Sequence, residues 1–440
     1  MKSGYKGALL DLDRKSRESV PSRRSRLSRE WIALAGRLGH DAEAFGEEDD
    51  PRPWLRPLPL WLAAVQAGGM PLLRAVEKRR CLLFHQPLRL TRFLSIGYVT
   101  PPSGLLEELA WLRELDVRQV VVPLDQDATD LQQVKALAAI QNLRSEDVRV
   151  AGVLRPKRGA AAEPDTWHQF CHWILSQAGW QLENAQLADG LDSHIREAKD
   201  AAAFAKLFTH VPRLRRDYPG VALLAPCLER FDLPLPVRAL CRLLPEGYAW
   251  DGVCMRAPAW QALESVGRDD LFLQRLVLAG AVAGRPGFAG GKVQVAFPPP
   301  PSGCEGAAEE RVAGSVVRRA VLAATSGVAD RVVVGMDPAL PVASRQIISI
   351  AVRELVEQLE GARFVRRVRV GDAGRDFVLE FARTGKPPVL VAWTDGEPRP
   401  VSVPFRLASA GDYLRRSVPL LPHPRIRLTR NMAYFVREGL

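Results

Sequence analysis

Eight short β-rich runs recur between residues 93 and 335, and amphipathic segments separate them. Each run is almost continuously apolar, which is typical of strands buried on both faces. The segments between them have helical periodicity, as crossovers between parallel strands require. The runs cover 93–98, 118–124, 148–154, 180–184, 221–226, 250–256, 292–297 and 331–335. Eight such units over about 250 residues predict a (β/α)8 TIM barrel, with a last helix at 342–361.

An open, doubly wound sheet is the alternative arrangement of alternating strands and helices. In that fold the first strand is commonly followed by a G-x-G-x-x-G phosphate turn. The turn after the first run here reads VTPPSG, and the chain has neither a P-loop nor a G-x-S-x-G elbow. The barrel is therefore favoured.

The changes in charge and hydrophobic pattern along the chain predict three parts. Residues 1–88 form a basic N-terminal extension with helical patterns at 27–38 and 60–83, and residues 89–360 hold the barrel. Residues 361–440 alternate short β-rich runs with turn residues. This last pattern predicts a small C-terminal antiparallel β module that docks on the barrel, because so small a sheet buries little by itself.

Charge is concentrated at the two ends of the chain. The net charge of +11 divides into +5 over residues 1–88, −2 over 89–360 and +8 over 361–440. Basic ends can meet anionic lipid, phosphorylated glycan or nucleic acid, or can simply be a solvated surface. Nucleic-acid binding is disfavoured, because few aromatic residues accompany the basic tail and no known motif is present.

The same charges suggest where the protein acts. The sequence contains no secretory signal peptide and no apolar tract of membrane-spanning length, so we expect a cytoplasmic protein. Peripheral contact with the anionic inner face of the membrane would use residues 53–62, PWLRPLPLWL, and the tail arginines. Those arginines are Arg425, Arg427, Arg430 and Arg437. The alternative is that residues 53–62 pack against the barrel.

Candidate binding residues come from the ends of the predicted strands, since barrel active sites lie at the carboxyl-terminal face. The stretch WQLENAQLADGLD, residues 180–192, ends in polar groups: Glu183, Asn184, Gln186, Asp189 and Asp192 could line a site. Across all eight strands, the residues expected to bind substrate are Tyr98, Asp125, Arg155, Asn184, Arg256, Trp260 and Asp337. Trp260 is the candidate for stacking on a sugar ring.

Several phrases, in this order, resemble clan A of the glycoside hydrolases, most closely its β-xylosidase and iduronidase-like members. LLEELAWLRELDVRQVVVPLD is similar to the helix that leads into the second strand, and VALLAPCLERFD to the fifth strand. WDGVCMRAPAW resembles the sixth-strand phrase, with Arg256 where histidine usually stands. DFVLEFARTGKPPVLVAWTDGEPRPVSV resembles the β module that follows the barrel. The resemblance covers roughly residues 93–405 and implies glycosidase chemistry.

The catalytic glutamates that the resemblance implies are missing. Matched to the family phrase at strand 4, Asn184 takes the asparagine position and Ala185 the acid/base position. At strand 7 the nucleophile position falls on Ala296 or Phe297, and residues 292–303 contain no acid. Retaining hydrolysis needs both carboxyl groups, so we expect a catalytically degenerate barrel. Relocated carboxylates at Glu183 and Glu229 are the alternative. For Glu183 we favour a structural role, paired with Arg155 or Arg256, because a buried carboxylate needs a partner.

Metal and cofactor chemistry is not expected. His168 and His172 share a helix face in WHQFCHW, but zinc would need further ligands that the sequence does not supply at a suitable spacing.

Taken with the missing catalytic glutamates, the resemblance predicts a glycoside hydrolase-like pseudoenzyme. Its expected partners are glycan or glycan-biosynthesis proteins in cell-surface polysaccharide or lipopolysaccharide metabolism.

Overall fold

A computed structural model describes most of the chain beyond residue 85. The described residues are 86–98, 105–189, 205–228, 250–257, 269–284, 288–299, 307–337, 342–372, 375–422 and 425–438. The N-terminal extension, with its expected helices and the apolar segment 53–62, lies outside these residues, as do Glu229 and Trp260.

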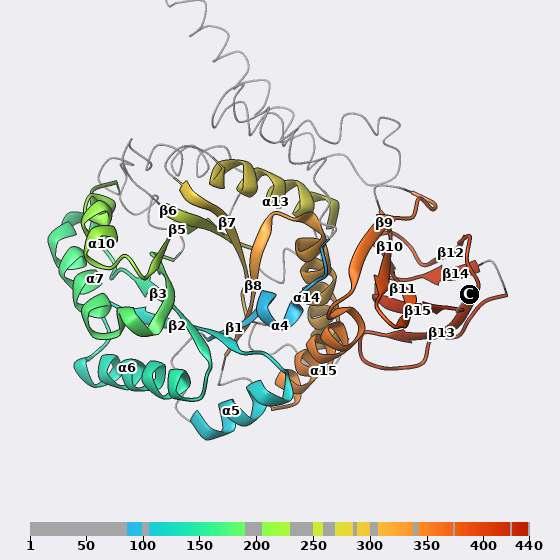
Figure 1. The fold of residues 1–440 in the computed structure, drawn as a ribbon, viewed down its shortest axis with the longest axis horizontal. Coiled ribbons are helices and arrows are strands. Elements are labelled where there is room, and N and C mark those ends of the chain that lie inside the picture. Colours follow the sequence, from blue (N-terminus) through green and yellow to red (C-terminus); the bar gives the residue numbers. More distant parts are fainter. Residues whose placement is uncertain are drawn as a thin grey trace, which may run out of the picture. The chain divides into compact units, whose positions relative to one another are not determined.

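Eight parallel strands close into a barrel in the order β1 to β8, with β8 pairing back onto β1. The prediction of a closed (β/α)8 barrel is confirmed, and Figure 1 looks onto its strands within a ring of helices. The strands are β1 (Leu94–Tyr98), β2 (Gln119–Asp125), β3 (Arg149–Arg155), β4 (Leu182–Leu187), β5 (Ala222–Leu228), β6 (Trp250–Arg256), β7 (Phe288–Phe297) and β8 (Ala329–Met336).

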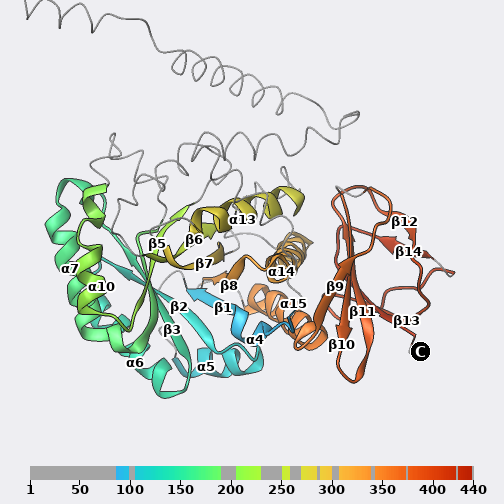
Figure 2. The same cartoon turned by 45° about the horizontal axis from the view of Figure 1, so that its top comes forward.

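Helices cover the outside of the barrel, and Figure 2 shows them from a second direction. They are α5 (Leu105–Glu114), α6 (Asp130–Ser145), α7 (Pro164–Ala178), α10 (Val211–Asp217), α13 (Asp269–Ala283), α14 (Ala307–Ser326) and α15 (Val342–Leu359), with 3-10 turns η2 (Ala160–Ala162), η3 (Gly179–Gln181) and η4 (Lys206–Phe208). The short helix α4 (Leu90–Phe93) directly precedes β1 and lies inside this ring in Figure 1. At α6, Thr129 and Gln132 form a reciprocal capping box, which fixes where this helix begins.

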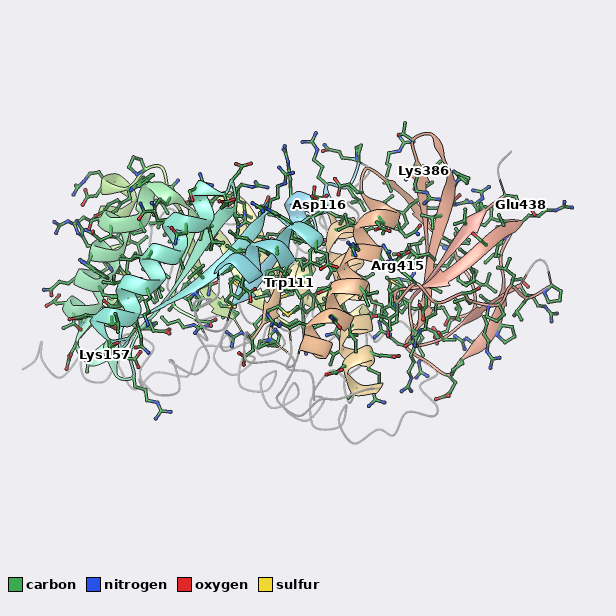
Figure 3. All side chains as sticks on the ribbon, turned by 90° about the horizontal axis from the view of Figure 1, so that it is seen from below. Trp111, Asp116, Lys157, Lys386, Arg415 and Glu438 are labelled. Carbon is green, nitrogen blue, oxygen red and sulfur yellow. The ribbon has the colours of Figure 1, made fainter. Side chains whose placement is uncertain are left out.

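Polar contacts join the first and last helices of the ring. The indole Nε1 of Trp111 on α5 donates to Ser349 Oγ on α15 at 2.7 Å, and Figure 3 labels Trp111 on α5. Arg345 of α15 also reaches Glu108 of α5 at 2.9 Å. The helix layer is therefore closed at the same place as the strand layer.

The C-terminal residues form two antiparallel sheets, which confirms the predicted β module. A five-stranded sheet has the order β13-β15-β11-β10-β9, and β12 pairs with β14. The strands are β9 (Arg363–Arg367), β10 (Asp376–Arg383), β11 (Lys386–Thr394), β12 (Arg399–Ser402), β13 (Leu407–Asp412), β14 (Arg425–Leu428) and β15 (Ala433–Arg437). Its own apolar cluster includes Leu390, Ile426 and Phe435.

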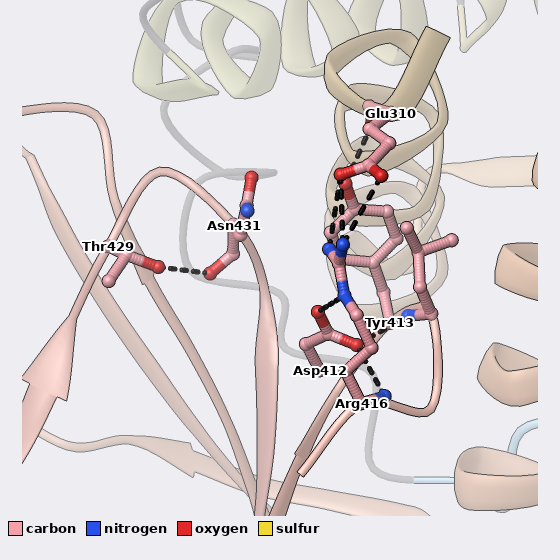
Figure 4. A network of polar contacts seen from close by, with 7 residues as sticks. Glu310, Asp412, Tyr413, Arg416, Thr429 and Asn431 are labelled. Atoms are coloured by element: carbon pink, nitrogen blue, oxygen red, sulfur yellow. Dashed lines mark hydrogen bonds and ion pairs between the residues drawn. The ribbon is translucent and has the colours of Figure 1, made fainter. Parts of the chain in front are cut away.

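An ionic network links the module to α14. Tyr413 donates its hydroxyl to the backbone carbonyl of Glu310 at 2.8 Å, and Arg416 reaches the Glu310 carboxylate at 3.2 Å (Figure 4). Asp412 accepts from the Arg416 Nε at 2.7 Å and so orients the guanidinium. Arg415, labelled in Figure 3, pairs with Glu354 of α15 at 2.9 Å.

A second link is a buried cluster around Asp269 at the start of α13. Its fully buried carboxylate accepts from the Trp393 indole of β11 at 2.8 Å and pairs with Arg318 and Arg319 of α14, each at 3.3 Å. The backbone N–H of Asp269 donates to Asp395 Oδ2 at 2.6 Å. Burial and then the neighbouring Asp269 charge raise the pKa of Asp395 to about 7.

This raised pKa predicts that stability depends on pH. Folded Asp395 keeps its proton up to about pH 7, whereas the unfolded chain releases it near 3.8. Between these values the folded state binds more protons, so the free energy of unfolding falls as pH rises, by at most about 4 kcal/mol. Asp395→Asn keeps an acceptor for Asp269 without the charge. We expect it to flatten the decline in melting temperature between pH 4 and 7.

The control is the same substitution at Asp147, whose side chain is 91% exposed. Its backbone is left-handed, which asparagine tolerates. Asp147→Asn should leave the pH profile as it is. A wild-type melting temperature that is level or rising from pH 4 to 7 would contradict the assignment to Asp395.

Candidate functional site at the barrel mouth

Charged side chains gather where the barrel strands end, and we call this place the mouth. It comprises Asp125, Arg155, Asp189, Arg256 and Asp337, which end or follow β2, β3, β4, β6 and β8. In four of these strands the charged residue directly follows a buried leucine or methionine. Because parallel strands end at one edge, this repeated pattern brings the charges to a single face.

Asp189 lies between two arginines. Its Oδ2 atom is 2.5 Å from Arg256 Nη2 and 3.5 Å from Arg155 Nε. Arg155 also reaches Asp125 Oδ1 at 3.6 Å with its Nη1 atom. Acids and bases therefore alternate across the mouth, and each guanidinium is positioned by a carboxylate.

The backbone before Asp189 is unusual. Ala188 has a φ of +75°, a left-handed conformation that a residue with a Cβ atom rarely adopts. Three hydrogen bonds fix it: its N–H donates to Leu154 O at 2.9 Å, and its carbonyl accepts from Gln186 Nε2 at 3.0 Å and Cys227 N at 3.3 Å. Such strain costs on the order of 1–3 kcal/mol and is often found at functional sites. Here the left-handed Ala188 is one extra residue between Leu187, the last residue of β4, and Asp189.

Burial changes the acid chemistry at the mouth. It raises the pKa of the Asp125 carboxyl above its usual range, and the Arg155 guanidinium opposes that rise. Beneath the arginines, Cys227 of β5 and Cys254 of β6 are register partners and fully buried. Burial and the neighbouring Cys254 thiol raise the pKa of Cys227 well above its usual value. Neither cysteine forms a disulfide.

The expectation that Glu183 and Asn184 lie at the carboxyl end of strand 4 is wrong. The strand begins at Leu182, because Gly179–Gln181 form a 3-10 turn that leaves Trp180 78% exposed. Glu183 therefore lies at the amino end, where it pairs with Arg331 at 2.9 Å and Arg149 at 3.7 Å. The expectation that Glu183 pairs with Arg155 or Arg256 is therefore wrong.

The expectation that Tyr98 faces the mouth is also wrong. Its hydroxyl donates to Glu108 of α5 at 3.0 Å, and the side chain is buried between the barrel and its helices. Burial and the Glu108 charge raise its pKa. Asp125, Arg155, Arg256 and Asp337 do lie at strand ends as expected, and whether they bind substrate stays a prediction.

The histidine pair on α7 has protein partners. His172 Nε2 lies 3.2 Å from the Tyr218 hydroxyl. The His168 ring stacks on His210 with 3.9 Å between centroids. Among the described residues, no group of three or more His, Cys, Asp or Glu side chains could hold a metal ion.

Comparisons with known proteins give likeness of structure alone. No protein-family model matches the chain, and no curated protein matches it. A GH30 endoxylanase from Clostridium papyrosolvens C71 has a TM-score of 0.49 and 8% identity over 81% of this chain and 98% of its own. The GH39 enzyme from Xanthomonas axonopodis pv. citri has a TM-score of 0.49 and 10% identity over 81% and 96%. A GH27 β-L-arabinopyranosidase from Geobacillus stearothermophilus has a TM-score of 0.46 and 10% identity over 80% and 98%.

Proposed function

We propose that this glycoside hydrolase-like barrel binds glycan at its mouth without cleaving it. Its place would be cell-surface polysaccharide or lipopolysaccharide metabolism, with glycan or glycan-biosynthesis proteins as partners. One observation carries the proposal: the mouth has the polar groups to hold a sugar, but no carboxylate at the end of β7.

Retaining hydrolysis needs two carboxyl groups about 5–5.5 Å apart. β7 ends at Phe297 and runs into prolines, and residues 292–303 contain no acid. The carboxylate that follows β4, Asp189, is engaged by Arg155 and Arg256. Asp189 therefore positions two guanidinium groups, as expected of a residue in a binding site.

Alternating acids and bases suit a glycan ligand. Sugar hydroxyls both donate and accept hydrogen bonds, whereas a carboxylate only accepts and a guanidinium only donates. The two arginines of the mouth are matched by Asp125 and Asp189, so their charges largely cancel. This balance favours an uncharged glycan over a highly anionic one.

An active glycosidase with relocated carboxylates is the second candidate. The observation that favours it is the raised pKa of Asp125, because a general acid needs a carboxyl that keeps its proton. Asp189 lies on the other side of the same Arg155 guanidinium and could serve as the partner. Glu183 is excluded from this role, since it lies at the opposite end of the barrel.

For the first test, the purified protein is incubated with a panel of aryl glycosides, and we expect no hydrolysis above background. Asp125→Asn, Asp189→Asn and Glu229→Gln are assayed beside it, with Glu183→Gln as the control at the far end. Turnover by the wild type that disappears in any of the first three variants would favour the active glycosidase.

The second test measures glycan binding by calorimetry, after a neutral ligand is selected on a glycan array. Arg256→Gln removes the charged donor and leaves Asp189 with one fewer partner, so affinity should fall roughly 10- to 100-fold. Arg353→Gln on the outer helix α15 is the matched control and should bind as the wild type does. Equal affinity in both variants would contradict a glycan site at the mouth.

Peripheral contact with an anionic membrane remains a proposal supported by the basic ends. No helix among the described residues has the length and apolarity to cross a bilayer. Arg425 and Arg427 are exposed on β14. Arg437, in contrast, pairs with Glu380 at 2.5 Å and lies over Phe405. The arginines of the tail are therefore not equivalent.

The third test is flotation with anionic liposomes. Binding at low salt should fall steeply as salt rises, because screening weakens each arginine's attraction of about 1 kcal/mol. The Arg425→Glu/Arg427→Glu double variant should float less than the wild type, and Arg353→Gln equally well. Absence of the wild type from the liposome fraction at low salt would overturn the membrane contact.

A further inference from the structure

The interior of the barrel has two chemically different halves. Val121, Ala151, Val153 and Val333 form a buried apolar cluster inside it, as is usual for this fold. The other half carries amides: Asn184 and Gln186 of β4 and Gln294 of β7 are each less than 8% exposed. Asn184 is the register partner of Ala151, so both side chains point inward.

A small cavity opens beside these amides at the amino end of the barrel. Its volume is about 30 Å³, and Asn184, Gln294, Ala222, Leu224, Lys292 and Arg331 are among the residues that line it. That is room for one or two water molecules. It is separate from the mouth, which lies at the carboxyl ends of the strands.

Hydrogen bonds fix which way the glutamine amides point. Gln186 Nε2 donates to Ala188 O at 3.0 Å, so its Oε1 atom is left for Gln294. Gln294 Nε2 donates to that oxygen at 3.5 Å and to Cys254 Sγ at 3.8 Å. Since its nitrogen is used in this way, the Oε1 atom of Gln294 faces away from Gln186.

Two buried oxygens are left without donors at the cavity. Neither Asn184 Oδ1 nor Gln294 Oε1 accepts a hydrogen bond from the described residues. Both belong to side chains that line the same cavity. A buried acceptor without a donor is costly, and two of them around one space call for a single molecule that donates twice.

We propose that this cavity is a built hydration site. One water molecule donates its two hydrogens to Asn184 Oδ1 and Gln294 Oε1. Two basic residues, Lys292 and Arg331, and two acidic residues, Glu183 and Asp330, line the same space, and Arg331 is paired with Glu183 at 2.9 Å. The water then begins a chain of hydrogen bonds that runs through the side chains of Gln294 and Gln186 to the carbonyl of Ala188.

A crystal structure of the full chain at about 1.5 Å resolution tests the water directly. We expect an electron-density peak within about 3 Å of both amide oxygens. An empty cavity, or a direct contact of about 3 Å between the Asn184 side-chain amide and Gln294 Oε1 with no density between them, would overturn the proposal.

Thermal unfolding gives a separate test, because hydrated and dry cavities predict opposite signs. Asn184→Leu displaces the water and strands Gln294 Oε1, so the melting temperature should fall by roughly 2–4 °C. In a dry cavity the same change removes an unpaired oxygen and fills space, so the melting temperature should rise. Leu224→Met, an apolar exchange in the same wall, is the control for packing.

The double variant Asn184→Leu/Gln294→Met separates lost bridging from poor packing. With both acceptors gone, no oxygen is stranded, so the double variant should lose less than the sum of the two single losses. Additive losses, or a melting temperature that rises in Asn184→Leu, would contradict a bridging water.

Discussion

Closure of the strand ring is the constraint from which the rest of the barrel follows. β8 must lie in register against β1, and five residue pairs from Leu94 to Tyr98 hold it there. Closure also requires room where the chain leaves β7. A Cβ atom on Gly335 would lie 2.4 Å from Phe297 O and 2.6 Å from Pro299 N, so only glycine lets these segments pass. Closing the ring brings the five charged strand ends to one face of the barrel, where Asp125, Arg155, Asp189 and Arg256 are in contact.

Strand identity could be predicted from the sequence because the runs are buried on both faces. A continuously apolar run between amphipathic segments leaves few alternatives, and all eight runs became barrel strands. The ends of β4 were harder to place. Its amide residues Asn184 and Gln186 are buried inside the barrel, so apolarity does not mark the limits of the strand. Trp180 suggested a strand that begins two residues too early. That offset put Asn184, and not Asp189, among the residues expected to bind substrate.

A signal for Asp189 was nevertheless present. Leu124–Asp125, Leu154–Arg155, Met255–Arg256 and Met336–Asp337 all place a charge directly after a buried apolar residue at a strand end. β4 has Leu187, then Ala188, then Asp189, so the pattern is offset by one residue. The sequence contains no mark that Ala188 is left-handed, because alanine seldom adopts that conformation. Pairings between distant segments were equally out of reach. The partners of Glu183 and Tyr98, and strands β13 to β15, depend on contacts that no local pattern encodes.

The buried Asp269 cluster has a consequence for how the described part of the chain can be divided. Asp269 belongs to a barrel helix, yet its carboxylate relies on the indole of Trp393 in the β module. Two barrel arginines face the same carboxylate, one of them only 3% exposed. Removing the module would open this cluster to water on one side and take away a neutral donor that the barrel does not replace. Barrel and module should therefore unfold in one cooperative transition, and proteolysis between them should yield no stable barrel fragment. We therefore expect the two, though they differ in architecture, to fold as one unit, and an insertion or deletion that separates them to destabilise both.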